Sequence, residues 1–246
     1  EMCIRDRLRP AKPVEPPLTF RAFLDFYVPL AMTSLLILLV QPIGASALSR
    51  MPRALESLAV WSVVSGLVFM LRSLGIAYNE VVVALLDEPH SSPSLRRFAT
   101  LLTTLTTLMI VIIAATPLAT IWFGRVSGLS PALVVLAQTG LWLALPLPGL
   151  NVMQSWYQGA LVHIRSTRGV TEAMGIFLVI TTAILSAGVA WGQIAGLYIG
   201  LVAFGVGSLT QTAWLWYRSR PVMRHLASRD AGGLPLQTAS SPVMSK

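Results

Sequence analysis

Several polar side chains interrupt long apolar stretches, and their types and spacing could do chemistry. Arg72, Asn79 and Glu80 lie in the run VFMLRSLGIAYNEVV. In a membrane helix, a central arginine costs about 2.5–3.5 kcal/mol on insertion scales, so its charge should face a partner or a water-filled cavity. Arg72 and Asn79 share nearly one helix face, with Glu80 about 80° further round. Either Arg72 and Glu80 line a substrate or ion pathway, or the helix breaks near Gly75 and they lie at an interface or in an ion pair.

A second polar group consists of three amides in one later stretch. Asn151, Gln154 and Gln158 have the spacing i, i+3 and i+7, which places them on one helix face. They could line an aqueous cavity, or they could hydrogen-bond neighbouring helices and hold them together, which is the plainer interpretation. Prolines should kink the first, third and fourth of the apolar stretches. The expected kinks are at Pro29, Pro42, Pro117, Pro146 and Pro148.

The sequence contains no motif for nucleotide binding, metal binding or enzymatic catalysis. The sequence contains no G-x-x-x-x-G-K-[ST] loop and no H-E-x-x-H pair, and the single cysteine excludes an internal disulfide framework. The three histidines are far apart, so we expect no metal site, no bound cofactor and no enzymatic activity. The net charge of +8 comes from arginines in short polar segments, not from a lysine-rich patch, which argues against nucleic acid as a partner.

The elements that position these residues follow from hydropathy. Of 246 residues, 54% are hydrophobic and only 11% charged, with a mean hydropathy of +0.70. Soluble domains carry roughly 25% charged residues, so we expect an all-α membrane protein embedded in a lipid bilayer. A span needs about 20 apolar residues. The six predicted transmembrane helices cover residues 24–48, 55–86, 98–123, 131–162, 171–191 and 194–217.

The flanking segments complete the predicted organisation. Residues 8–22 are rich in proline and predict a cytoplasmic linker, 23–217 the six-helix lobe, and 218–246 a disordered cytoplasmic tail. Residues 1–7, EMCIRDR, match an in-frame translation of a sequencing adapter, so we expect the natural sequence to begin elsewhere. Beyond those residues, the predicted loops place twelve Lys and Arg on one side and three on the other. The positive-inside rule then predicts a multi-pass protein of the inner (plasma) membrane with both termini cytoplasmic.

Two stretches carry a resemblance to a known family. FYVPLAMTSLLILLVQPIGASALSR, followed by LAVWSVVSG, resembles the opening helix pair of a lobe in the MOP exporter superfamily. LPLPGLNVMQSWYQGALVHIRSTRGVTEAMGIFLVITTAIL resembles the fourth-to-fifth helix region of such a lobe. The superfamily includes multidrug and toxic compound extrusion (MATE) transporters, polysaccharide flippases and progressive ankylosis proteins.

The resemblance implies a fold and a function. The fold would have twelve helices in two lobes, with this chain as the C-terminal lobe and a missing N-terminal lobe as its partner. It would export a small-molecule or lipid-linked substrate by alternating access, driven by H⁺ or Na⁺. Glu80 would match an acidic residue of the ankylosis type and act in coupling or gating, Arg72 would balance substrate charge, and the three amides would line the cavity. The alternatives are a membrane scaffold without transport activity and an intramembrane enzyme acting on lipid.

Overall fold

Helices make up the regular structure of the computed structural model, which describes all residues except 1–19, 87, 89, 165–166 and 233–246. The prediction of an all-α chain is confirmed, and the described part contains no sheet. The α-helices are α2 (Phe20–Leu48), α3 (Ala54–Leu85), α4 (Ser91–Ala115), α5 (Leu118–Thr120), α6 (Pro131–Ala144), α7 (Pro146–His163), α8 (Arg168–Trp191) and α9 (Gly196–Gly232). A short π-helix, η1 (Ile121–Val126), follows α5.

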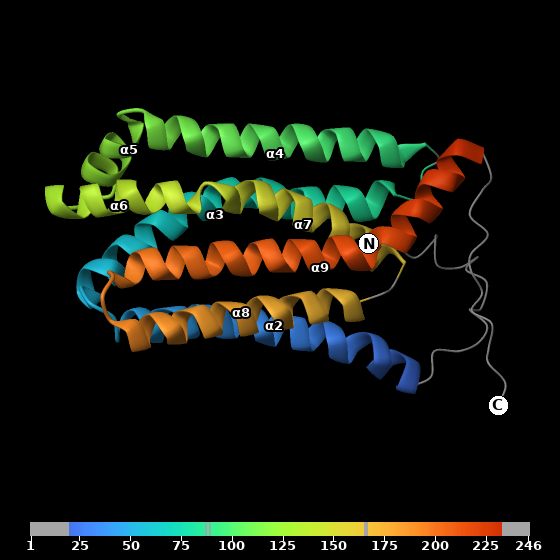
Figure 1. The fold of residues 1–246 in the computed structure, drawn as a ribbon. Helices are drawn as coiled ribbons and strands as arrows, with labels where there is room; N and C mark the ends of the chain where they lie inside the picture. The colour runs from blue at the N-terminus through green and yellow to red at the C-terminus, as the bar shows by residue number, and fades with distance from the viewer. Residues whose placement is uncertain (1–19, 87, 89, 165–166, 233–246) are drawn as a thin grey trace, which may run out of the picture.

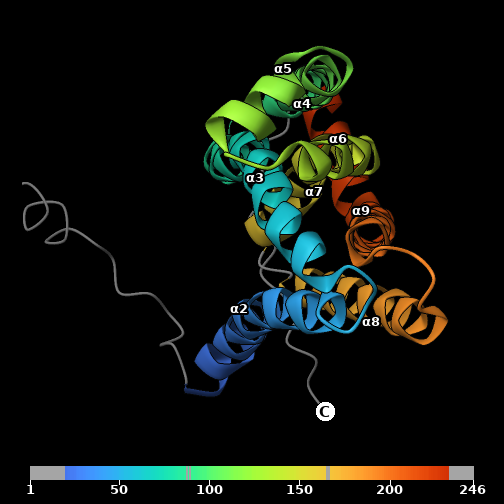
Figure 2. The ribbon, with the colours of Figure 1, turned by 90° about the vertical axis from the view of Figure 1, so that its left-hand side faces the viewer.

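The long helices run up and down between two ends of one bundle (Figure 1). The connections after α2 and α8, together with α5 and η1, lie at one end, and the connections after α3 and α7 lie at the other. Seen along the helices, α4 and α5 form one outer side, α2 and α8 the opposite side, and the remaining helices lie between them (Figure 2). We call the end that holds the α3–α4 connection and the last turns of α9 the basic end. The arginines that lie there are Arg96, Arg97, Arg168, Arg218, Arg220, Arg224 and Arg229.

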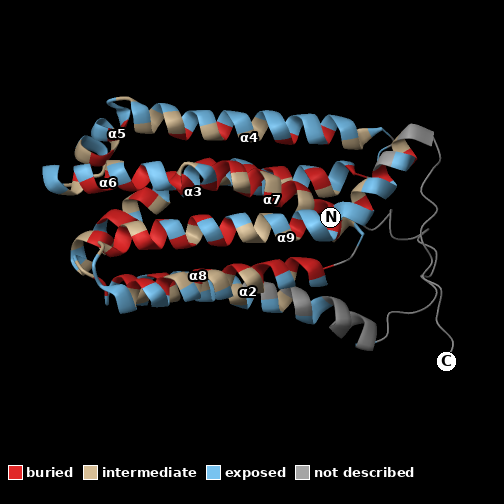
Figure 3. Cartoon of the chain, viewed as in Figure 1, coloured by how far each residue is buried: buried red, intermediate tan, exposed pale blue. Residues whose placement is uncertain are grey.

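Length and hydropathy make this a multi-pass membrane architecture. Within the part of the chain that the structure describes, five helical stretches are long and apolar enough to cross a membrane, namely α3, α4, α6 with α7, α8, and α9. They correspond to the second to sixth predicted spans. The first corresponds to α2, a helix of 29 residues; Leu35–Leu48 is the apolar stretch that lies among its described residues. Many large apolar side chains are exposed on the helices, as a lipid-facing surface requires, while others are buried between the helices (Figure 3).

Prolines mark two of the places where a predicted span is interrupted. The third predicted span ends early, because α4 stops at Ala115 and Thr116 is extended before Pro117 leads into α5. The fourth is divided at Leu145, after which Pro146 begins α7 and Pro148 lies in its first turn. Pro29 and Pro42, in contrast, lie inside α2, which continues through both. The Pro42 side chain is exposed, and that of Pro29 lies outside the described part.

The prediction of a disordered tail from residue 218 is wrong for residues 218–232, which continue α9. Polar composition suggested disorder, but Val222 and Leu226, one turn apart, are buried against the core at the basic end. Pro221 lies inside the helix, and the last turns of α9 bend across the basic end toward α4 (Figure 1). Residues 233–246 lie outside the described part, as do residues 8–19 of the predicted linker; residues 20–22 already belong to α2.

Candidate functional site

The helices α3 and α7 run side by side in the same direction, and this contact, which we call the α3–α7 seam, brings two of the predicted site residues, Asn79 and Asn151, between them (Figure 1). Gly75 faces Asn151, and a Cβ atom on Gly75 would lie 2.5 Å from Oδ1 of Asn151. One turn further, Nδ2 of Asn79 donates a hydrogen bond to the carbonyl oxygen of Ser155 at 3.1 Å. The absence of a side chain at Gly75 therefore lets the two backbones approach closely.

Arg72 lies one turn before Gly75, at the edge of the buried face of α3. It is thirteen residues from the last residue of α3, which corresponds to about 20 Å along the helix and places it near the middle of a bilayer. Its Nε atom is buried and has no hydrogen-bond partner among the described residues. Oδ1 of Asn151 and Oγ1 of Thr103 are likewise buried without a partner. Such orphaned polar atoms are rare in folded proteins and point to strain, to function or to an absent water or ion.

Glu80 lies apart from this group. Its side chain is exposed, and it is five residues from the last residue of α3, so it is close to the basic end. The structure describes both Arg72 and Glu80 and shows no ion pair between them, although it shows others, such as Arg218 with Glu172. The two predicted pathway charges are therefore not brought together in this conformation.

The three amides of α7 do not share one environment. Asn151 faces α3, whereas Nε2 of Gln154 donates to the carbonyl oxygen of Ser208 and to Oγ1 of Thr212 on α9, both at 3.1 Å. Gln158 is half-buried. Gln154 and Asn79 thus join α7 to its two neighbours, as expected for polar groups that hold helices together.

A separate pocket opens at the basic end between α4, α7 and α9. It has a volume of about 940 Å³, and we call it the arginine pocket. Its charged lining consists of Arg96, Arg97, Arg220, Arg224 and Asp230, and its aromatic lining consists of Trp156, Tyr157 and Trp216. A cluster of guanidinium groups and aromatic rings is suited to a planar or tetrahedral anion attached to an apolar group.

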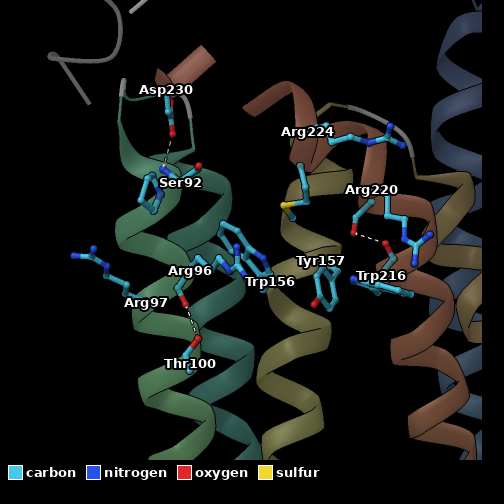
Figure 4. Close-up of a pocket in the computed structure, with 13 residues that line it drawn as sticks. Ser92, Arg96, Arg97, Thr100, Trp156, Tyr157, Trp216, Arg220, Arg224 and Asp230 are labelled. Atoms are coloured by element: carbon cyan, nitrogen blue, oxygen red, sulfur yellow. Dashed lines mark hydrogen bonds between the residues drawn. The ribbon is translucent and has the colours of Figure 1, made fainter. Parts of the chain in front are cut away.

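The side chains of the arginine pocket come from three helices (Figure 4). Arg96 of α4 lies beside Trp156 of α7, whereas Arg97 points outward. The guanidinium carbon of Arg220 lies 3.7 Å from the centre of the Trp216 ring on α9, which is cation–π geometry. Sequence reasoning used these arginines only to assign a membrane side. The useful signal was the i, i+4 spacing of Trp216 and Arg220, which places a cation over an aromatic ring on one helix face.

Asp230 is engaged with the backbone and with a neighbouring charge. Its carboxylate accepts hydrogen bonds from the backbone amides of His90 and Ser92 at 3.3 and 3.2 Å and pairs with Arg229 at 2.9 Å. Arg229 in turn donates to the carbonyl oxygens of Leu86 and Glu88 at 3.0 and 3.2 Å. These adjacent residues of α9 thereby bind the end of α3 and the start of α4.

Among the described residues, no three His, Cys, Asp or Glu side chains form a group that could hold a metal ion. No protein-family model, no curated protein sequence and no solved structure matches the chain.

Proposed function

We propose that the chain is one lobe of a secondary transporter of the MOP exporter type, which exports or flips an amphipathic or anionic substrate by alternating access. The observation that carries this proposal is Arg72, a cation at mid-membrane depth whose Nε is buried without a partner. An intramembrane charge is costly, and such charges mark substrate or ion pathways when no structural partner accounts for them.

The seam supports a role in which the lobe moves as a unit. Close approach at Gly75 and the hydrogen bond from Asn79 fix α3 against α7, while Gln154 fixes α7 against α9. A lobe packed in this way would rock as a rigid body around a central site. In that motion the unpartnered Nε of Arg72 would find its partner in substrate or in the opposite lobe.

Orientation and energy supply are part of the same proposal. The basic end would face the cytoplasm, because short basic segments are retained on that side. An H⁺ or Na⁺ gradient would drive the exchange, with Glu80 near the basic end of α3 as the coupling or gating carboxylate.

The test is a flux measurement on the full-length protein in proteoliposomes, with anilinonaphthalene sulfonate as an amphipathic anionic probe. We expect Arg72→Ala to reduce gradient-driven flux at least tenfold and Arg72→Lys to retain part of it. Arg50→Ala, which removes an exposed arginine at the opposite end of the bundle, is the control and should leave flux unchanged. Equal flux in wild type and Arg72→Ala, at equal amounts of folded protein, would overturn the assignment of Arg72.

The two-lobe organisation has its own test, which is the genomic sequence upstream of the codon for Leu8. A further block of six apolar segments in the same reading frame is the expected result. A stop codon followed by a start site immediately before Leu8 would contradict the proposal of a missing N-terminal lobe.

A second candidate function is favoured by the two amides that are already satisfied. Asn79 and Gln154 form hydrogen bonds with neighbouring helices, which is what a membrane scaffold or assembly subunit without transport activity requires. Under that alternative, Arg72→Ala would change stability or partner binding and the wild-type protein would carry no flux. The same proteoliposome experiment therefore separates the two.

A further inference from the structure

The arginine pocket adjoins a second, more apolar groove. The groove lies between α7 and α9 and has a volume of about 340 Å³. It shares Tyr157 and Trp216 with the pocket, and its other lining residues are Leu150, Met153, Leu209, Thr212 and Ala213. Leu150 and Leu209 each lie seven residues before the shared aromatic residue of their helix, so the groove extends about 10 Å toward the middle of the bundle. A ligand with a charged head and an apolar tail could therefore place its head in the arginine pocket and its tail in the adjoining groove.

The pocket has more positive charge than its own carboxylate can balance. Among the described residues, Arg96, Arg97, Arg220 and Arg224 form no ion pair, whereas Arg218 and Arg229 are paired with Glu172 and Asp230. Asp230 is the only carboxylate among the described residues that line the pocket, and it is already bound by Arg229 and two backbone amides. The unbalanced charge favours a ligand group with more than one negative charge.

The pocket also lies at the depth where lipid headgroups are found. Arg96 and Arg97 precede the apolar part of α4, which starts near Phe98, and Arg220 and Arg224 follow the apolar part of α9, which ends at Tyr217. Trp214, Trp216 and Tyr217 mark the same level, because indole and phenol rings prefer the membrane interface. The groove below them lies at acyl-chain depth.

We propose that the arginine pocket and its groove bind one anionic phospholipid of the surrounding leaflet, with a phosphomonoester headgroup among Arg96, Arg220 and Arg224 and an acyl chain between Leu150 and Leu209. Arg97 lies at the rim and adds to the local potential. Basic pockets between membrane helices on the cytoplasmic side bind acidic headgroups by the same physics. This lipid site goes beyond the proposed transport function and does not require that the bound lipid be transported.

The lipid, not a free anion, is the occupant that the structure favours. A free phosphate would use the guanidinium groups alone and leave the apolar groove beside them empty. Tyr157 and Trp216 line both cavities, so the polar and apolar parts lie next to each other. A lipid in the leaflet can enter it from the side without leaving the bilayer.

The experiment is native mass spectrometry of the detergent-purified chain, titrated with dioleoyl phosphatidic acid and, separately, with dioleoyl phosphatidylcholine. We expect one phosphatidic acid to bind at least tenfold more tightly than phosphatidylcholine. The double variant Arg96→Gln/Arg220→Gln should lose this preference. Arg168→Gln removes an exposed arginine of the basic end that does not line the pocket, and it should keep the preference.

A groove variant distinguishes lipid from free anion. Ala213→Trp fills the groove from an exposed position and leaves every charge in place, so it should weaken phosphatidic acid binding at least fivefold. Circular dichroism at 222 nm on each variant verifies that the helices are intact, and Arg220→Lys, which keeps the charge, should retain part of the preference. An equal loss in Arg168→Gln and in the double variant would overturn the site. Displacement of the lipid by an equal concentration of inorganic phosphate, with Ala213→Trp unaffected, would overturn the lipid assignment.

Discussion

Gly75 of α3 and Asn151 of α7 lie in direct contact, with no room for a side chain between them. A Cβ atom on Gly75 would lie 2.5 Å from Oδ1 of Asn151 and 3.2 Å from the backbone nitrogen of Val152. The backbone of α7 cannot move aside as the end of a flexible side chain would. This contact sets the distance between α3 and α7 and, with it, the surroundings of Arg72.

Gly75→Ala should therefore destabilise the protein. The added methyl group forces α3 and α7 apart, and overpacking of this kind costs about 1–3 kcal/mol. Gly66 on the same helix is the matched control, because a Cβ atom there meets nothing within 4 Å. Gly66→Ala should be neutral or stabilise by about 0.5–1 kcal/mol, through the helix preference of alanine. Thermal unfolding in detergent measures both, and equal melting temperatures for the two variants would contradict the close contact.

Gln154→Ala should weaken the attachment of α7 to α9. The variant removes hydrogen bonds to Ser208 and Thr212, and such interhelical bonds contribute about 0.6–1.7 kcal/mol in membrane proteins. Gln158→Ala on the same helix is the comparison, because Gln158 forms no interhelical hydrogen bond with any described residue. A lower melting temperature for Gln154→Ala alone is expected. If Gln158→Ala has the larger effect, the assignment of Gln154 as the residue that joins these helices is wrong.

Asp230→Ala should release the last turns of α9 from the bundle. The side chains of Arg229 and Asp230 are only 6% and 5% exposed, and removal of the carboxylate leaves a buried guanidinium without its counter-charge. Loss of one partner of a buried pair costs about 3–5 kcal/mol. Hydrogen exchange should rise in residues 218–232 and in the α3–α4 connection. Ser228→Ala, which removes only a local bond to the carbonyl oxygen of His225, should leave this exchange unchanged.

The two ends of the bundle should be accessible from opposite sides of the membrane. Arg168 lies at the basic end and Arg125 in η1 at the other, and both are exposed. In a background with Cys3→Ser, a membrane-impermeant maleimide should label Arg125→Cys in intact cells and Arg168→Cys only in inverted vesicles. Labelling of both cysteines in intact cells would show that the segments between them do not separate the two ends.

Hydropathy predicted the helices well because it is a local property. Each apolar run is long enough to specify its own helix, and Pro117 and Pro146 interrupt the backbone wherever the rest of the chain lies. The end of α9 was missed for a related reason. Averaged composition hid the pair Val222 and Leu226, whose burial depends on contacts with distant parts of the chain.

The candidate sites could not be predicted from the sequence, because they depend on contacts between helices. Asn151 and Gln154 are about 60° apart around α7, and because α7 lies between α3 and α9, that angle directs them to different neighbours. The arginine pocket brings Arg96 and Arg220 together from positions more than a hundred residues apart. Sequence periodicity describes the faces of one helix, but which faces meet depends on the packing of all of them.

The α3–α7 seam also has a consequence for how the protein is made. Asn79 and Ser155 are 76 residues apart, so the ribosome completes α3 long before it completes α7. At roughly 5–20 residues per second, the delay is about 4–15 s. Throughout that time Asn79 has no α7 to bond to, while the arginine in the same helix costs about 2.5–3.5 kcal/mol in the bilayer. The other, apolar residues of α3 offset that cost, so α3 can insert first, and the seam closes only when α7 follows it into the bundle.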